Sequence, residues 1–154
     1  RVTNAGNDQG QMSPMLEQLH ETHGKYPGQA LVDGGFISLE EVEWAARHGC
    51  NVIGPLKDEQ KQLAAGKNPY VKKKGDPPGV VEFRGRMQTP EAKDTYKLRA
   101  QTAEWVNAQC RNRNLRQMPV RGLDKCNNVA ILHALVHNFT VLMRLQAGEN
   151  PDKP

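Results

Sequence analysis

The sequence has few of the features that mark secreted, zinc-binding or membrane proteins. Its three cysteines, Cys50, Cys110 and Cys126, are odd in number and not close to one another. This argues against a disulfide framework and against a zinc site of the Cys-X-X-Cys type. No run of about 18 apolar residues is present and no secretory signal, so we expect no membrane span. A reducing, cytoplasmic setting fits these absences.

Aromatic residues are also scarce, at 5% of the 154 residues, so we expect a modest, aliphatic core in a chain of one domain's length. Ten prolines and fourteen glycines indicate much loop. The net charge of +4 is compatible with nucleic-acid binding, although many soluble proteins carry as much. Because the chain begins at Arg1 and not at Met, we expect a fragment of a longer protein.

Residues 12–24 contain the residue types that commonly start and end a helix. Ser13 can cap its start, Pro14 suits the first helical position, and Gly24 can end it. The apolar residues that fall on one face of this helix are Met12, Met15, Leu16 and Leu19.

The next residues alternate between strand and helix patterns. A short strand is expected at 29–33, a helix at 39–48 and a second strand at 51–56, and Ser38 with Glu41 forms a capping box for the helix. Strands that alternate with helices predict an α/β fold, with a short, mostly parallel sheet flanked by helices.

The pattern changes after the second strand. Residues 57–95 are basic and rich in proline and glycine, which predicts a long insertion loop. Helices are expected at 90–114 and 123–146, followed by a disordered tail at 147–154. The last helix is predicted to cover the sheet with apolar residues at helical spacing: Val129, Leu132, Leu135, Val136, Phe139, Leu142 and Met143.

Asp33 is the first candidate for chemistry. It directly follows a strand, and the carboxyl ends of parallel strands are where open α/β sheets bind ligands. Gly34 and Gly35 would let a bulky anion come close. The alternative is a plain turn, since Asp-Gly is a common turn pair, and the pattern alone favours the turn.

The helix at 90–114 contains a second candidate. Tyr96, Glu104, Asn107 and Arg111 could share one broad polar face, which Arg99 fits poorly. On spacing alone, a solvated face with an intrahelical ion pair is the more favoured interpretation.

Basic residues form two clusters that either contact phosphates or solubilise the surface. The first lies in the expected loop and consists of Lys57, Lys61, Lys67, Lys72, Lys73 and Lys74. The second follows Glu104 and consists of Arg111, Arg113, Arg116, Arg121 and Lys125. His133 and His137 share a helical face, but no third metal ligand is apparent, so packing or a hydrogen bond is favoured.

Four stretches carry a more specific signal. They read, in order, VTNAGNDQGQMSPMLEQL, LVDGGFISLEEVEWAARHG, YKLRAQTAEWVNAQCRNRNLRQMPVRGLDK and ALVHN. Together they resemble the C-terminal half of bacterial insertion-sequence DDE transposases, from Val2 to about Asn138. The most specific part is a signature of Tyr96, Arg99, Glu104 and a basic residue, here Arg111.

The resemblance implies an RNase H-like fold and a catalytic Asp, Asp, Glu set that holds two divalent ions, Mg²⁺ or Mn²⁺. Asp33 would be the second aspartate and Glu104 the glutamate, both catalytic and metal-binding. No residue matches the first aspartate; Asp8 falls in the loop after that region.

The resemblance also implies DNA as partner, both transposon ends and target. Water would attack the phosphodiester at a transposon end, and the freed 3′-hydroxyl would then attack the target. The DNA-binding residues would be Tyr96, Arg99, Arg111, Arg113, Lys72, Lys73 and Lys74. We further expect a homodimer of the full-length protein, located in the cytoplasm at the nucleoid, with no membrane partner.

Three hypotheses are therefore open. The chain is part of an active transposase, or a truncated and inactive remnant that binds DNA nonspecifically, or a basic structural or RNA-binding domain without metal. The first implies a polynucleotidyl transferase in which this fragment alone is inactive.

Overall fold

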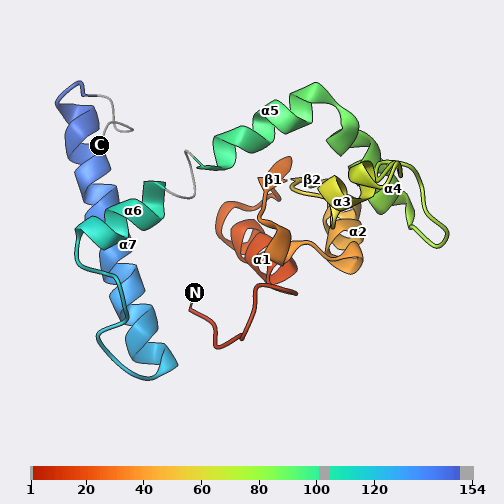
Figure 1. Ribbon diagram of the computed structural model, residues 1–154. Helices are drawn as coiled ribbons and strands as arrows, with labels where there is room; N and C mark the ends of the chain where they lie inside the picture. Colours follow the sequence, from red (N-terminus) through yellow and green to blue (C-terminus); the bar gives the residue numbers. More distant parts are fainter. Residues whose placement is uncertain (1, 101–104, 150–154) are drawn as a thin grey trace. The chain divides into compact units, whose positions relative to one another are not determined.

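The computed structural model describes residues 2–100 and 105–149 (Figure 1). The chain divides into two compact units, one of residues 6–101 and the other of residues 1–5 with 102–154. The described residues form seven α-helices, a short 3-10 helix and a two-stranded parallel sheet. The predicted α/β class is therefore confirmed, with a small sheet, whereas the extent of one domain over residues 1–146 stays a prediction.

The first half of the larger unit follows the predicted order of helix, strand, helix and strand. The four elements are α1 (Met12–His23), β1 (Gln29–Leu31), α2 (Leu39–Arg47) and β2 (Asn51–Ile53). Both strands are shorter than predicted. The two strands pair in parallel, as expected for strands joined by a crossover helix.

The carboxyl ends of the two strands lie close together. Leu31 pairs with Ile53, and the Val32 amide donates to the Ile53 carbonyl at 3.0 Å. At Gly54 the approach leaves no space for a side chain, because a Cβ there would lie 2.6 Å from Ile37 Cδ1 and 2.8 Å from the Val32 carbonyl oxygen. This glycine lets the segments that leave β1 and β2 pack side by side.

Three of the predicted helix caps can be compared with the structure. Gly24 ends α1 in the left-handed conformation, as predicted. Ser38 caps α2 by accepting from the Glu41 amide, which confirms one half of the predicted capping box, whereas the described contacts of the Glu41 carboxylate go to Ser13. Ser13 as the cap of α1 is wrong, because that position belongs to Gln11. Instead, the Ser13 amide and hydroxyl donate to the Glu41 carboxylate at 2.6 and 2.8 Å. A buried acid from α2 thus satisfies the first turn of α1.

The long loop predicted at 57–95 is wrong for most of its length. That segment contains α3 (Glu59–Ala64), α4 (Pro78–Gln88) and the start of α5 (Pro90–Arg99). Helix α4 is a core element, since it contributes three almost fully buried side chains: Val80, Phe83 and Met87.

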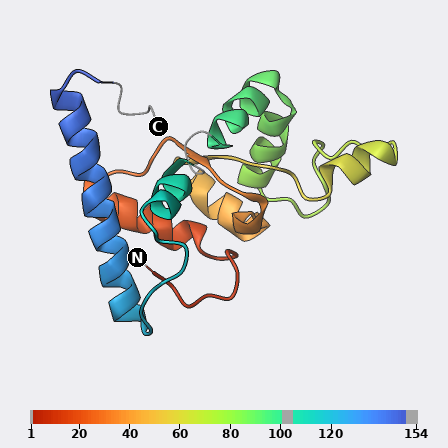
Figure 2. The same ribbon diagram turned by 60° about the vertical axis from the view of Figure 1, so that its left-hand side comes forward.

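Helix α4 packs directly against α2, and it also contacts β2 and α5 (Figures 1 and 2). The closest approach is at Gly79, where a Cβ would lie 2.5 Å from the Ala46 Cβ. The Gly79 amide donates to the Glu43 carboxylate at 2.8 Å. A side chain at position 79 would therefore push α4 away from α2 and open the core.

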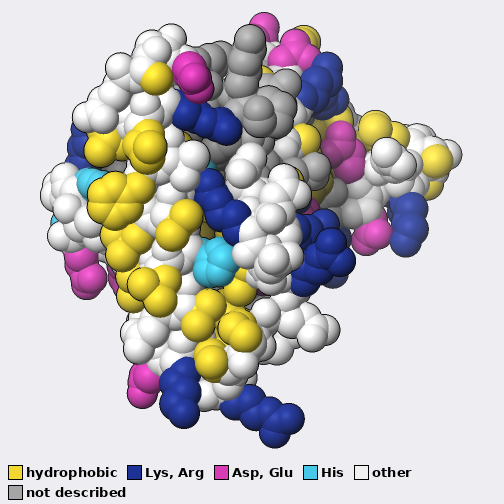
Figure 3. Space-filling model, turned by 90° about the vertical axis from the view of Figure 1, so that its left-hand side faces the viewer, with side chains coloured by type: hydrophobic (Ala, Val, Ile, Leu, Met, Phe, Trp, Pro, Cys, Tyr) yellow, Lys and Arg dark blue, Asp and Glu magenta, His cyan; other side chains and the backbone are white. Residues whose placement is uncertain are grey.

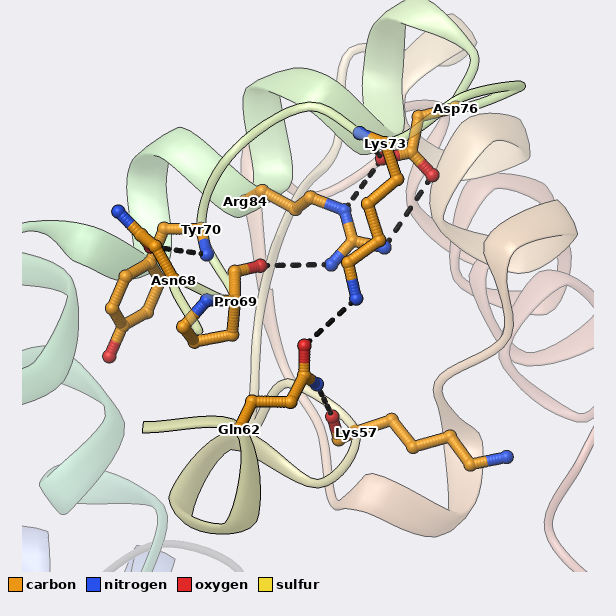
Figure 4. Close-up of polar contacts among 8 residues, drawn as sticks. All are labelled: Lys57, Gln62, Asn68, Pro69, Tyr70, Lys73, Asp76 and Arg84. Carbon is orange, nitrogen blue, oxygen red and sulfur yellow. Dashed lines mark hydrogen bonds and ion pairs between the residues drawn. The ribbon is translucent and has the colours of Figure 1, made fainter. Parts of the chain in front are cut away.

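A buried ion pair fixes the segment that leads into α4 (Figure 4). Arg84 Nε donates to Asp76 Oδ2 at 2.7 Å, and the two side chains are 9% and 4% exposed. The guanidinium also donates to the Pro69 carbonyl at 3.0 Å. The Lys73 amide also donates to Asp76 Oδ2 at 2.8 Å, and the Lys73 ammonium donates to Gln62 Oε1 at 2.9 Å. The connection between α3 and α4 is thus held by polar contacts.

This ion pair predicts a loss of stability in acid. Burial opposes ionisation of Asp76, but hydrogen bonds from Arg84 and the Lys73 amide, together with the charges of Arg84 and Lys73, hold its pKa below the ordinary value. The pair therefore stabilises the fold fully above the unfolded pKa, about 3.9, and the contribution is lost as pH falls through the lower folded pKa.

Urea unfolding between pH 6 and pH 2.5 tests this linkage. The Asp76→Asn variant should be less stable at pH 6, and its stability should fall less with acidification than that of the unchanged protein. Parallel pH profiles for the two proteins would contradict the assignment to Asp76.

The smaller unit contains α6 (Trp105–Asn112) and α7 (Leu123–Gln146). The range predicted for α7 is confirmed, whereas its predicted role as a cover of the sheet, which belongs to the larger unit, stays a prediction. No residue of α7 is buried, and the apolar stripe from Leu132 to Met143 is exposed, with Phe139 at 62% (Figure 3). The less exposed stripe includes polar residues such as His133 and Thr140. The described residues of the smaller unit therefore leave the apolar face of its long helix uncovered.

By length and composition alone, α7 is also apolar enough to cross a membrane, with a mean hydropathy of 1.2, and it is the single such helix in residues 2–100 and 105–149. No unbroken apolar run marks this helix in the sequence, because polar residues interrupt the pattern. In the predicted tail, residues 150–154 lie outside the described residues.

Candidate nucleic-acid and metal site

Asp33 lies two residues beyond the end of β1, where it starts the short 3-10 helix η1 (Gly34–Phe36). One carboxylate oxygen, Oδ1, accepts from the Gly34 amide at 2.7 Å and caps this turn. The other oxygen, Oδ2, accepts from Arg99 at 2.7 Å. The turn is therefore present as the pattern favoured, and the carboxylate, 58% exposed, still faces a basic group.

Arg99 reaches Asp33 from the last residue of α5, 66 positions along the chain. Its guanidinium carbon lies 6.0 Å from the centre of the Tyr96 ring, within the range of a cation–π contact. The ion pair is partly exposed, so it stabilises the fold by about 1 kcal/mol at most. The structure thus brings Asp33, Arg99 and Tyr96 together, although helical spacing alone placed Arg99 away from the polar face.

The two glycines after Asp33 have near neighbours. A Cβ at Gly34 would lie 3.4 Å from Pro55 Cγ, and one at Gly35 would lie 3.2 Å from Asp8 Oδ2. The idea that both glycines leave open space for a phosphate is therefore wrong at Gly35. Instead, Gly35 allows a second carboxylate to approach the turn. Sequence reasoning set Asp8 aside, and no local pattern marks this contact.

The remaining residues of the predicted polar face and of the second basic cluster are less completely described. Glu104 lies outside the described residues, and so does the side chain of Asn107. Arg111 is exposed on α6, and Arg113 donates to Thr140 on α7 at 3.2 Å. These last contacts belong to the smaller unit. Where one helix was predicted over 90–114, the structure describes two, α5 and α6.

The three lysines predicted to bind DNA differ in their contacts. Lys72, Lys73 and Lys74 are all exposed. Lys73 is the one whose ammonium has a described partner, Gln62. The three lysines carry equal charge, and the middle one, Lys73, is held in place by this contact.

No group of three histidine, cysteine, aspartate or glutamate side chains in the described part of the chain could hold a metal ion. This includes His133 and His137, which are half-buried on α7. The oxygen donor at Asp33 is of the kind that Mg²⁺ binds.

Comparison with known families identifies a segment of the chain. Residues 79–143 match the family model described as the transposase DDE domain. The predicted resemblance to DDE transposases is therefore confirmed, and the chain is consistent with a DDE transposase fragment. The matched segment covers α5 and α6, and thus Tyr96, Arg99 and Arg111. No curated protein and no solved structure matches the chain.

Proposed function

We propose that this chain is part of a DDE transposase that cuts and joins DNA at the ends of an insertion sequence. The observation that carries the proposal is the contact between Asp33 and Arg99. Arg99 lies inside the segment that matches the transposase DDE domain, and Asp33 lies outside it. The ion pair thus links Asp33, a candidate from its position after a strand, to the matched segment.

In this proposal Asp33 and Glu104 would hold Mg²⁺ or Mn²⁺ in an RNase H-like fold. Carboxylate oxygens are the donors that such hard cations take, and the exposed Asp33 carboxylate fits that requirement. A bound pair of ions supplies charge neutralisation for the attacking and leaving oxygens of an in-line displacement.

The chain's own residues position the DNA. Arg99 orients the Asp33 carboxylate and offers positive charge to a phosphate next to it, and the Tyr96 ring supports the guanidinium. Arg111, Arg113 and the lysines at 72–74 would neutralise the DNA backbone farther from the reacting bond. The full-length protein would act as a homodimer at the bacterial nucleoid.

Metal dependence tests this function. The full-length protein is incubated with a duplex that carries the ends of the parent element, in EDTA and then with added Mg²⁺. We expect strand cleavage in Mg²⁺ alone, and DNA binding in both conditions. Binding without any cleavage would support the inactive remnant instead, and cleavage in EDTA would overturn the proposed metal site.

A further inference from the structure

The larger unit contains a pocket of about 460 Å³ that the proposed transposase site does not use. Its residues come from the turn before α2, the segment after β2, α3, the α3–α4 connection and α4. Val80, Phe83 and Leu56 are almost fully buried and form its floor, whereas Leu39 is 50% exposed and forms part of its mouth. The volume is in the range of small-molecule sites, which are commonly lined by apolar groups with a few polar ones.

The pocket lies at the carboxyl edge of the sheet. Ile37, in its wall, follows Asp33 by four positions, and Leu56 follows β2 by three. Pro55, next to Leu56, is the residue that a Cβ at Gly34 would touch. Ligands of open parallel sheets bind at this edge, and Asp33 and the pocket residues Ile37 and Leu56 all follow the carboxyl ends of the same two strands.

Three of the four charged residues that line the pocket are cations. Lys57 and Lys73 lie at the exposed edge, and Arg84 lies at the base, where Asp76 already neutralises it. Figure 4 shows the Lys57 side chain extending away from the Gln62 contacts, while its carbonyl accepts from Gln62 at 2.7 Å. The ammonium of Lys73 uses one of its three donors on Gln62, so two donors are left for an anion.

One acid, Asp58, is among the pocket residues that the structure describes. It forms an ion pair with Lys61 at 3.3 Å, which reduces its repulsion of an anion. The pocket therefore combines an apolar floor with two exposed lysines in its lining. A free inorganic anion would use the lysines but leave the apolar floor unfilled.

We propose that this pocket binds one nucleotide unit of a DNA strand, with the phosphate at Lys57 and Lys73 and the sugar and base over the apolar floor. This inference rests on the proposed function, since it places a strand of the DNA substrate beside Asp33. Stacking of bases on aromatic side chains and contact of phosphates with basic side chains are the usual components of single-strand binding. In this pocket Phe83 is the aromatic residue of the lining.

Amide NMR of the isotope-labelled full chain tests this proposal. The chain is titrated separately with deoxythymidine 5′-monophosphate, with thymidine and with inorganic phosphate. We expect the nucleotide to shift signals at 37–39 and 56–58 and to bind more tightly than either of its parts. An oligothymidylate should shift the same signals at lower concentration. Tighter binding of the free nucleotide than of the oligonucleotide would overturn the assignment to a DNA strand.

A matched pair of double variants separates the effect of the two pocket lysines from a general effect of positive charge. Lys57→Gln with Lys73→Gln should weaken nucleotide binding at least about tenfold, since charge-assisted contacts are lost. Lys25→Gln with Lys67→Gln removes the same charge at two exposed lysines that do not line the pocket, and it should change nucleotide binding less than about twofold. Equal losses in the two pairs would overturn the pocket.

A third variant, Leu39→Glu, places a carboxylate at the exposed mouth and should likewise weaken nucleotide binding at least about tenfold. Retained binding in Leu39→Glu would overturn the proposed position of the sugar and base. Failure of the pocket is distinguishable from failure of the proposed function. Mg²⁺-dependent cleavage that persists without nucleotide binding would remove this pocket alone and leave the transposase assignment standing.

Discussion

Replacement of Asp33 by Asn in the full-length protein should abolish cleavage of transposon ends while DNA binding persists. Asn has the shape of Asp, and its carbonyl oxygen can still accept from the Gly34 amide, so the turn cap is kept. The neutral amide cannot supply an anionic oxygen to a cation. Loss of several kcal/mol of charge stabilisation corresponds to a fall in rate of about a thousandfold.

The expected fall is far larger than any effect on folding. The Asp33–Arg99 ion pair is partly exposed and contributes about 1 kcal/mol at most, so thermal unfolding should change little. Glu104→Gln should reduce cleavage to a similar extent. Asp94→Asn is a suitable control, because Asp94 forms an exposed ion pair with Lys97 on the same helix as Arg99. It should retain full cleavage.

Cleavage rates of the three variants, measured in Mg²⁺ with saturating DNA, decide the assignment. Full activity of both Asp33→Asn and Glu104→Gln would show that neither carboxylate takes part in the chemistry. A loss in Asp94→Asn as large as that in Asp33→Asn would point to a general sensitivity to charge and not to a metal ligand.

Local signals predicted the first half of the larger unit well. Gly24, Ser38 and the spacing of apolar residues act within a few positions of the elements that they define, so α1, β1, α2 and β2 could be placed from the sequence. Ser13 shows the limit of such rules. Its local capping role is replaced by a contact with Glu41, 28 positions away, which no local pattern contains.

Composition misled the prediction for residues 57–95. Lysines, prolines and glycines there resemble a loop, yet Pro78 begins α4, and Val80, Phe83 and Met87 follow at helical spacing. That spacing was the available signal. The contacts that order the rest of the segment are paired charges, such as Arg84 with Asp76, and their pairing is a property of the fold.

The candidate site was only partly within reach of sequence reasoning. Asp33 could be found from its place after a strand, whereas Arg99 is 66 positions away and helical angles separated it from the other polar residues. Family resemblance supplied Arg99, and the structure places it on the carboxylate. The contact of Asp8 with Gly35 had no signal, because it depends on how the first loop returns to the turn.

Removal of the Arg84 guanidinium should destabilise the larger unit by about 3–5 kcal/mol, because Arg84→Ala leaves a buried carboxylate without its partner. The Asp76 side chain is 4% exposed, and it would keep only the Lys73 amide as a described donor. The Pro69 carbonyl would also lose its donor from Arg84. The connection between α3 and α4 would then lose the contacts that hold it, and Lys73 would lose its fixed position.

Urea unfolding at pH 7 measures this loss against a matched pair of controls. Lys97→Ala breaks an ion pair whose side chains are 76% and 69% exposed, so it should change stability by less than about 0.5 kcal/mol. The double variant Arg84→Met with Asp76→Leu should recover much of the loss, since two apolar side chains remove both buried charges. If Arg84→Ala were as stable as Lys97→Ala, the Arg84–Asp76 pair would have no part in ordering residues 66–77. Lys73, which lines the proposed nucleotide pocket, would then have to be held in place by other contacts.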